Sequence, residues 1–164
     1  MTEKTVEKTT GKMTVKTTEK KSGRTEERFE IRLIRRSEVL EAAEAERLCF
    51  PPNEAGTREV VKARATLAGE QFLVAVDRET GRLAGYLNGL VTDESTLRDG
   101  FFKQTDLHDP RGANVMVLSL GVLPQYRRQG LASVLMACYV RQERERARRM
   151  LVLTSLAETL GLHL

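Results

Sequence analysis

A strand–turn–helix pattern between residues 115 and 136 carries the residues whose types and spacing could bind an anion. Residues 115–122, VMVLSLGV, form an apolar run of strand length that is rich in β-branched side chains. Beyond a turn at Pro124, apolar residues recur with the period of one helix face, at Leu131, Val134, Leu135 and Cys138. The segment Arg127-Arg128-Gln129-Gly130 lies between the two, where the helix is expected to begin.

The start of such a helix is suited to phosphate groups. The first four amide N–H groups of a helix have no partner within it, and the helix dipole adds partial positive charge there. Gly130 and Ala132 lack bulk, so the backbone can approach a pyrophosphate closely. Arg127 and Arg128 add cationic donors, and Ser133 adds a hydroxyl. The spacing by itself is equally compatible with an ordinary strand–turn–helix that carries surface arginines.

The pattern Arg-x-x-Gly-x-Ala, at residues 127–132, resembles the acetyl-CoA signature of the GNAT superfamily of N-acetyltransferases. Three stretches, HDPRG at 108–112, LSLGV at 118–122 and YRRQG at 126–130, resemble the arylalkylamine (serotonin) N-acetyltransferase branch. The similarity covers roughly residues 44–154 and is most specific between 108 and 136.

This resemblance implies direct transfer of acetyl from acetyl-CoA, the co-substrate, to the primary amine of a small arylalkylamine. It places pantetheine between strands 115–122 and 151–154, against the backbone of Leu120, Gly121 and Val122, and Gly121 is expected to form a β-bulge there. The Leu120 amide would stabilise the oxyanion of the thioester. The residues assigned to the pyrophosphate are Arg127, Arg128, Gln129, Gly130, Leu131, Ala132 and Ser133.

A substrate amine arrives protonated and must lose a proton before it attacks. The paired imidazoles of the animal arylalkylamine enzymes correspond here to Met116 and Leu118, which are aliphatic. Ser119, Glu54, Asp93 and His108 remain as candidates for this proton transfer. Ser119, on the strand, and Glu54, in the loop expected to cover the amine, are predicted as catalytic residues beside the Leu120 amide. His108 matches a family histidine outside the chemistry and is expected to be structural.

The end of the chain departs from the family pattern. The family places a tyrosine that protonates the leaving thiolate after the strand that corresponds to 151–154, but here no tyrosine follows Tyr139. The sequence therefore predicts a C-terminally truncated member without the closing hairpin, in which strand 151–154 is an exposed sheet edge. The alternative function is a catalytically impaired module that binds CoA or a protein partner, and a protein acetyltransferase is a weaker third.

The order of predicted elements gives the fold class. Residues 1–28 are mostly Thr, Lys and Glu with almost no large apolar residue and are predicted to be a disordered, low-complexity tail, which leaves 29–164 as one acetyltransferase domain. Strands are expected at 29–34, 72–76, 83–91, 115–122 and 151–154, and helices at 37–48, 57–68 and 128–149. The sequence thus predicts an α/β (α+β) fold of GNAT type, a mixed and largely antiparallel sheet with helices on both faces.

Composition and charge limit the classes of binding partner and the cellular location that the sequence predicts. The net charge of +4 comes from basic residues interleaved with acidic ones, and aromatic residues are few, so nucleic acid is not expected. No apolar run reaches the length of a membrane span, and no metal site is predicted. Cys49 and Cys138 are expected to be buried thiols in a cytoplasmic protein. The sequence does not indicate an oligomeric state.

Overall fold

The computed structural model describes residues 24, 25, 27–155 and 158–164, with only the backbone described at 155 and 158–163. The predicted disordered tail, residues 1–28, lies almost entirely outside the described residues. The rest of the chain forms strands and helices that alternate along the sequence, as the apolar periodicity predicts.

The centre of the fold is a six-stranded sheet in which the strands follow one another in chain order. The strands are β1 (Phe29–Leu33), β2 (Phe72–Asp77), β3 (Leu83–Thr92), β4 (Asn114–Val122), β5 (Met150–Ser155) and β6 (Glu158–His163). All neighbouring pairs are antiparallel except β4 and β5, which are parallel. The helix between these two parallel strands must therefore cross one face of the sheet.

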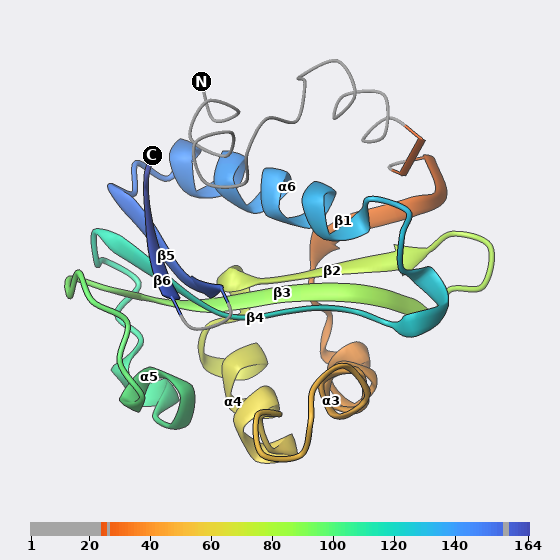
Figure 1. The fold of residues 1–164 in the computed structure, drawn as a ribbon, viewed down its shortest axis with the longest axis horizontal. Helices are drawn as coiled ribbons and strands as arrows, with labels where there is room; N and C mark the ends of the chain where they lie inside the picture. Colours follow the sequence, from red (N-terminus) through yellow and green to blue (C-terminus); the bar gives the residue numbers. More distant parts are fainter. Residues whose placement is uncertain (1–23, 26, 156–157) are drawn as a thin grey trace.

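Helices cover both faces of the sheet (Figure 1). The helix α6 (Leu131–Glu145) lies on one face, while α3 (Val39–Cys49), α4 (Arg58–Leu67) and the short α5 (Gly100–Lys103) lie on the other. Four 3-10 turns complete the described helical elements, at Arg36–Glu38, Gly69–Gln71, Thr105–Leu107 and Pro124–Tyr126. The prediction of a mixed, largely antiparallel sheet between two helical layers is confirmed.

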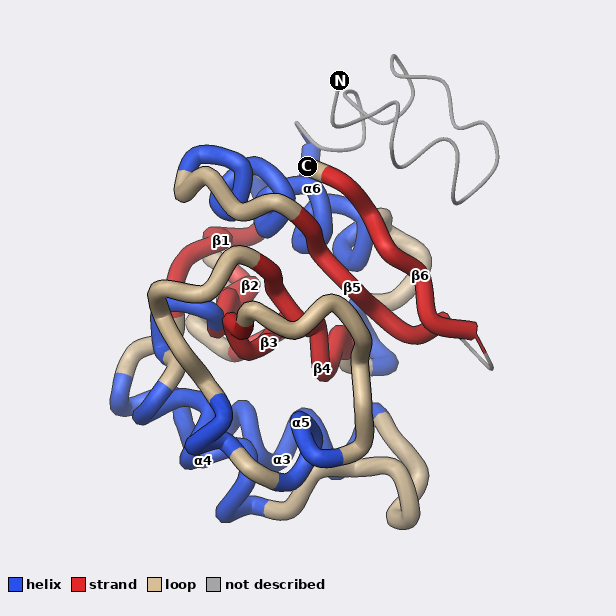
Figure 2. The backbone as a smooth tube through the Cα atoms, turned by 90° about the vertical axis from the view of Figure 1, so that its left-hand side faces the viewer, coloured by secondary structure: helices blue, strands red, loops and turns tan. Residues whose placement is uncertain are grey.

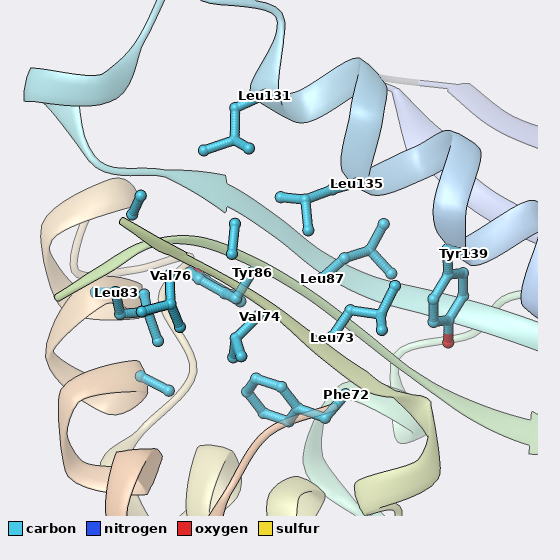
Figure 3. Close-up of a cluster of buried hydrophobic side chains, with 14 of the residues drawn as sticks. Phe72, Leu73, Val74, Val76, Leu83, Tyr86, Leu87, Leu131, Leu135 and Tyr139 are labelled. Carbon is cyan, nitrogen blue, oxygen red and sulfur yellow. The ribbon is translucent and has the colours of Figure 1, made fainter. Parts of the chain in front are cut away.

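The apolar side chains pack on both faces of the sheet. Leu131 and Leu135 of α6 approach one face, and Phe72 and Tyr86 lie with their rings 6.2 Å apart (Figure 3). The strands β2 and β3 are buried along their whole length, because a helix covers each of their faces. These two strands therefore form the rigid centre against which β4 is held.

The expectation that strand 151–154 is an exposed sheet edge is wrong. All six residues of β5 pair in antiparallel register with β6. The sequence ETLGLH of β6 places Leu160 and Leu162 at alternate positions, a pattern typical of a strand. Its backbone satisfies the N–H and C=O groups that β5 would otherwise expose, so β5 and β6 form a hairpin at this end of the sheet (Figure 2).

Gly89 provides a test of the register between β3 and β4. A Cβ atom at this position would lie 2.5 Å from the carbonyl oxygen of Met116 and 2.8 Å from the hydroxyl oxygen of Tyr139. Because a buried strand and a buried ring would both have to move, we expect Gly89→Ala to lower the free energy of unfolding by about 2 kcal/mol. Gly69→Ala is the matched control, since nothing lies within 4 Å of its added Cβ. Equal midpoints in urea for the two variants would contradict this packing.

Candidate functional site

The sheet opens between β4 and β5. These strands are in register only where residues Asn114–Met116 face Met150–Val152, whereas β3 stays paired with β4 as far as Val122. Beyond the short pairing β5 diverges from β4 (Figure 1). The backbone of residues 117–122 consequently has no strand partner on the β5 side among the described residues.

The backbone groups of Leu120 face this opening. The N–H of Leu123 donates to the carbonyl oxygen of Ala84 at 2.9 Å, so residue 123 points toward β3. Successive residues of a strand point their backbone groups to opposite sides, so the N–H groups of Leu120 and Val122 point away from β3. The carbonyl oxygen of Val122 is consistent with this direction, since it accepts a hydrogen bond from Nε of Arg127 at 2.8 Å.

A β-bulge distorts β4 beside the opening. Asn88 of β3 faces Ser119, but the next residue, Gly89, faces Val117, so Leu118 is the extra residue of β4. The sequence suggests Gly121 as the bulge position, and this is wrong. Gly121 instead makes room for the ring of Tyr86, which would lie 2.7 Å from a Cβ at that position. Bulges of this kind re-aim side chains and are common beside active sites.

The loop before α6 has the geometry of an anion site. Arg128 and Gly130 both adopt the left-handed region, with φ of 63° and 78°. Gly130 is the N-cap of α6, and no side chain caps this end. The N–H groups of Leu131, Ala132 and Ser133 therefore lack intrahelical acceptors, as the first amides of any helix do, and remain available to a ligand.

Contacts on the β1–β2 side hold the loop in place. The Tyr126 hydroxyl donates to Oδ2 of the buried Asp77 at 2.8 Å, and its ring packs edge-on against Phe29 at 5.5 Å. The Thr25 hydroxyl donates to the carbonyl oxygen of Gln129 at 3.1 Å. Burial and the neighbouring carboxylate of Asp77 raise the pKa of Tyr126, so its hydroxyl stays protonated and keeps donating. The loop is thus fixed before any ligand arrives.

The two cysteines form no disulfide, as predicted, although both are only partly buried. Cys49 ends α3 close to the loop. Burial raises the pKa of its thiol, and the hydrogen bond with Arg127 offsets this only in part. A thiol of raised pKa is a poor nucleophile, so Cys49 does not suggest a covalent intermediate.

A buried carboxylate lies on the opposite side of the sheet from α6. Glu46 of α3 is only 3% exposed. Its Oε1 accepts from Ser119 Oγ at 2.6 Å and from the Tyr86 hydroxyl at 2.5 Å, and its Oε2 accepts from the Gly56 N–H at 2.7 Å. Ser119, predicted as a catalytic candidate, therefore donates a hydrogen bond directly to a carboxylate.

Tyr86 and Ser119, which both contact Glu46, have different chemical roles. Burial, reinforced by the nearby Glu46, raises the pKa of Tyr86 well above its ordinary value, so Tyr86 serves as a fixed hydrogen-bond donor. The Ser119 hydroxyl lies 3.3 Å from the Tyr86 hydroxyl and next to the bulge. A proton taken up by Ser119 can pass to Glu46 along an existing hydrogen bond, which is the wiring that general-base catalysis needs.

A buried arginine accompanies the carboxylate. Arg64 of α4 is 2% exposed, and it donates from Nη1 to Asn88 Oδ1 at 3.3 Å and from Nη2 to the carbonyl oxygen of Phe102 at 3.1 Å. Its Nε and the Asn88 Nδ2 are buried without a hydrogen-bond partner among the described residues. Burial lowers the pKa of Arg64, while the nearby Glu46 opposes this shift.

The other candidates from the sequence lie elsewhere. Glu54 is exposed in the loop between α3 and α4, outside the Glu46 cluster. His108 accepts from the Val91 N–H at 3.0 Å through Nδ1 and lies 2.6 Å from Glu70 through Nε2, contacts that fit the expected structural role. Met116 and Leu118, which the resemblance aligns with imidazole positions, belong to a separate apolar cluster.

The sequence reasoning missed Glu46, Tyr86, Arg64 and Asn88. A signal for two of them was present, because a charged residue lay on an apolar helix face. Glu46 follows Ala42 and Ala43 by four and three residues, and Arg64 follows Val61 by three and precedes Ala68 by four. Tyr86 and Asn88 carried no such signal, since the sequence alone does not show that both faces of β3 are covered.

Two further observations concern the described part of the chain. It contains no group of three or more His, Cys, Asp or Glu side chains arranged to hold a metal ion. None of its helices combines the length and the apolar character needed to cross a membrane.

The sheet thus opens beside a bulged strand, and the unpaired amides at the start of α6 lie at one end of the opening. The profile of the acetyltransferase (GNAT) family matches residues 39–162, which is most of the chain. The chain belongs to this family. No curated protein matches it.

Solved structures agree on the fold. The GphF GNAT-like decarboxylase in complex with isobutyryl-CoA is 23% identical, with a TM-score of 0.67 over 75% of this chain. The loading GNATL domain of CurA from Lyngbya majuscula is 16% identical, with a TM-score of 0.69 over 79% of this chain. The chain spans 64% and 66% of these two neighbours. A GNAT family acetyltransferase from Brucella melitensis, in complex with acetyl-CoA, is 16% identical, with a TM-score of 0.57 over 82% of this chain and 87% of that one.

The pH at which the tyrosines ionise tests whether their side chains are buried. The chain has three tyrosines and no tryptophan, and burial raises the pKa of Tyr86, Tyr126 and Tyr139. A raised folded-state pKa means that stability is full below pH 10 and falls as the pH rises above it, because the unfolded chain loses its phenolic protons first. The loss is about 1.4 kcal/mol per pH unit for each tyrosine that stays protonated in the fold. Tyrosinate absorbance should therefore appear together with unfolding in circular dichroism, and its appearance in folded protein at pH 10 would contradict the burial.

Proposed function

We propose that the chain is an N-acetyltransferase that transfers acetyl from acetyl-CoA to the primary amine of a small arylalkylamine. The observation that carries this proposal is the continuity of the site. The opening beside Leu120 begins at the amides of α6 and ends at the bulge where Ser119 contacts Glu46. Such a path suits a long co-substrate with a phosphate end and a reactive thioester end.

Acetyl-CoA is the co-substrate in this proposal, and GNAT neighbours with acetyl-CoA or another acyl-CoA bound support it. The pyrophosphate binds the N–H groups of Leu131, Ala132 and Ser133, with Arg128 supplying charge. The pantetheine arm occupies the gap that β5 leaves beside residues 117–122, where it can pair with the outward backbone groups of Leu120 and Val122 as a further strand would. Arg127, through its bond to Val122, holds the loop against β4.

The reaction is a direct attack. The neutral amine adds to the thioester carbon and forms the C–N bond, the Leu120 N–H stabilises the resulting oxyanion, and this intermediate collapses as the C–S bond breaks. The ammonium proton leaves first, through Ser119 to Glu46. CoA departs as a thiolate, and the second proton that the nitrogen loses on becoming an amide passes through water to this thiolate. Tyr139 cannot supply that proton, because it is fully buried and its hydroxyl donates to Gln71 at 2.8 Å.

A second candidate is the removal of a carboxylate from a carboxyacyl-CoA. GphF is a GNAT-like decarboxylase, and it and the CurA loading domain superpose with TM-scores of 0.67 and 0.69. In such a reaction the C–C bond to the carboxylate breaks, CO2 leaves, and the remaining carbon takes a proton. The buried Arg64 favours this candidate as a counter-charge for a carboxylate.

The loop assignment is tested through Arg128. We expect Arg128→Asn to weaken acetyl-CoA binding about 10-fold, since a hydrogen bond between charged groups contributes roughly 1.5 kcal/mol. Asparagine tolerates the left-handed backbone at this position, so the loop keeps its shape. Arg141→Asn, at an exposed position further along α6, is the matched control and should bind as the parent does. Equal affinities by calorimetry for all three proteins would remove Arg128 from the site.

The proton path is tested with tryptamine or phenylethylamine as acceptor and a thiol-release assay. We expect Ser119→Ala to lower kcat about 100-fold, the usual effect of losing a general-base relay, and to leave acetyl-CoA binding intact. Glu54→Gln separates the two candidate bases. A large loss in Glu54→Gln with none in Ser119→Ala would make Glu54 the base, while acetyl-CoA binding without thiol release in the parent would favour the alternative, a CoA-holding module.

A further inference from the structure

Two buried donors beside the bulge have no acceptor. The Nε–H of Arg64 and the Nδ2 amide of Asn88 belong to side chains that are 2% and 0% exposed, and neither atom has a hydrogen-bond partner among the described residues. The assigned orientation of Asn88 is consistent, because its Oδ1 accepts from Arg64 Nη1 at 3.3 Å. The two groups without a partner are therefore both hydrogen-bond donors, and only a hydrogen-bond acceptor can satisfy them.

The charge of Arg64 also lacks a direct partner. Its two made contacts are to neutral oxygens, those of Asn88 and Phe102. Among the described residues no carboxylate lies within 4.0 Å of its guanidinium. Burying a guanidinium without a carboxylate is unfavourable, and the planar fork of arginine fits a carboxylate in a bidentate manner.

These donors lie at the point where the acyl group would react. Asn88 is the cross-strand partner of Ser119, next to the extra residue of the bulge. Side chains opposed in this way on one face of a sheet lie within about 5 Å at Cβ. A group held by Arg64 and Asn88 is thus close to the Ser119 hydroxyl and to the backbone of Leu120.

Opposite charges flank the same spot. A Cβ on Gly56 would lie 3.4 Å from Glu46 Oε2 and 3.8 Å from Arg64 Nη1, so the carboxylate and the guanidinium both lie near Gly56, although they form no ion pair within 4.0 Å. Glu46, reached through Ser119, suits the ammonium end of a substrate. Arg64 and Asn88 suit an anionic end.

We propose that Arg64 and Asn88 form a carboxylate-binding subsite, so that the substrate carries a carboxylate near the bond that reacts. This rests on the proposed function for the position of the thioester. The carboxylate comes either from the acceptor, as in an α-amino acid whose ammonium faces Ser119 and Glu46, or from the acyl chain of a carboxyacyl-CoA. Both sources present the same chemistry to the two donors.

Matched pairs that differ by the carboxylate alone test the subsite. The full chain, saturated with acetyl-CoA, is titrated by calorimetry with tryptophan and tryptamine, phenylalanine and phenylethylamine, and 2,4-diaminobutyrate and 1,3-diaminopropane. In a second arm, malonyl-CoA is compared with acetyl-CoA without acceptor. We expect the carboxylated member of at least one pair to bind at least 10-fold more tightly. A preference in the first arm assigns the carboxylate to the acceptor, and one in the second arm assigns it to the acyl chain.

Variants separate binding from folding. In Arg64→Gln the ratio of the two affinities should fall to about 1, while Arg58→Gln, at an exposed position on the same helix, should keep the parent ratio. Asn88→Asp is a second variant for the case in which Arg64→Gln does not fold. It gives Arg64 a carboxylate partner, and the aspartate has the same size as the asparagine that it replaces. It should unfold at the parent temperature or above and still lose the preference, since its charge repels a bound carboxylate.

The outcome that overturns the proposal is equal affinity within every pair in both arms, which would mean that a water molecule completes the two donors. A preference that survives in Asn88→Asp and in Arg64→Gln would also overturn it, because the carboxylate would then bind elsewhere. Thiol release with tryptamine reports on the proposed acetyl transfer independently, so failure of the subsite and failure of the transferase activity give different results.

Discussion

The short pairing between β4 and β5 is the constraint on which the site depends. Three residues of each strand are in register, and the remaining backbone of β4 on that side is left to something other than the sheet. Unpaired backbone groups in a covered sheet are unfavourable unless a ligand or water satisfies them. Among the described strand pairs, only β4 and β5 leave backbone groups unpaired in this way. The helix α6 and its preceding loop point toward this opening. The opening and the unpaired backbone beside Leu120 are thus consequences of one choice of register, whereas the uncapped end of α6 follows from Gly130 at its N-cap.

Much of this arrangement is readable from the sequence because it is local. The strand at 115–122, the glycine at the helix start and the arginines between them are all close in the chain, and the structure places them as strand, left-handed loop and helix. The carboxylate cluster is not local. Glu46 meets Ser119 across 73 residues of sequence, and only the register of β3 against β4 brings Tyr86 to the same spot. The bulge was misplaced for a similar reason, since Gly121 is small to admit a ring and not to relieve the strand.

The end of the sheet shows how comparison with a family pattern can mislead. The family pattern predicts a helix and a tyrosine after residue 154, whereas the alternating ETLGLH segment has the pattern of a strand. The backbone groups of β5 require partners whatever the family does elsewhere, and β6 supplies them. The physical requirement was the better guide here. In the proposed reaction the departing thiolate is protonated through water, which suffices for a thiol of ordinary pKa.

The two faces of the sheet treat buried charge differently, and this contrast strengthens the assignment of function to one of them. Under α6, Glu143 is fully buried and accepts from Gln71, Arg146 and Arg148 at 3.1 to 3.3 Å. That network is complete without a ligand, so this chain is able to satisfy a buried charge with its own side chains. On the α3–α4 face Glu46 is equally satisfied, yet Arg64 beside it retains an unused donor. Since incomplete buried networks cost stability, the unused donors are best explained by a partner that arrives with the substrate.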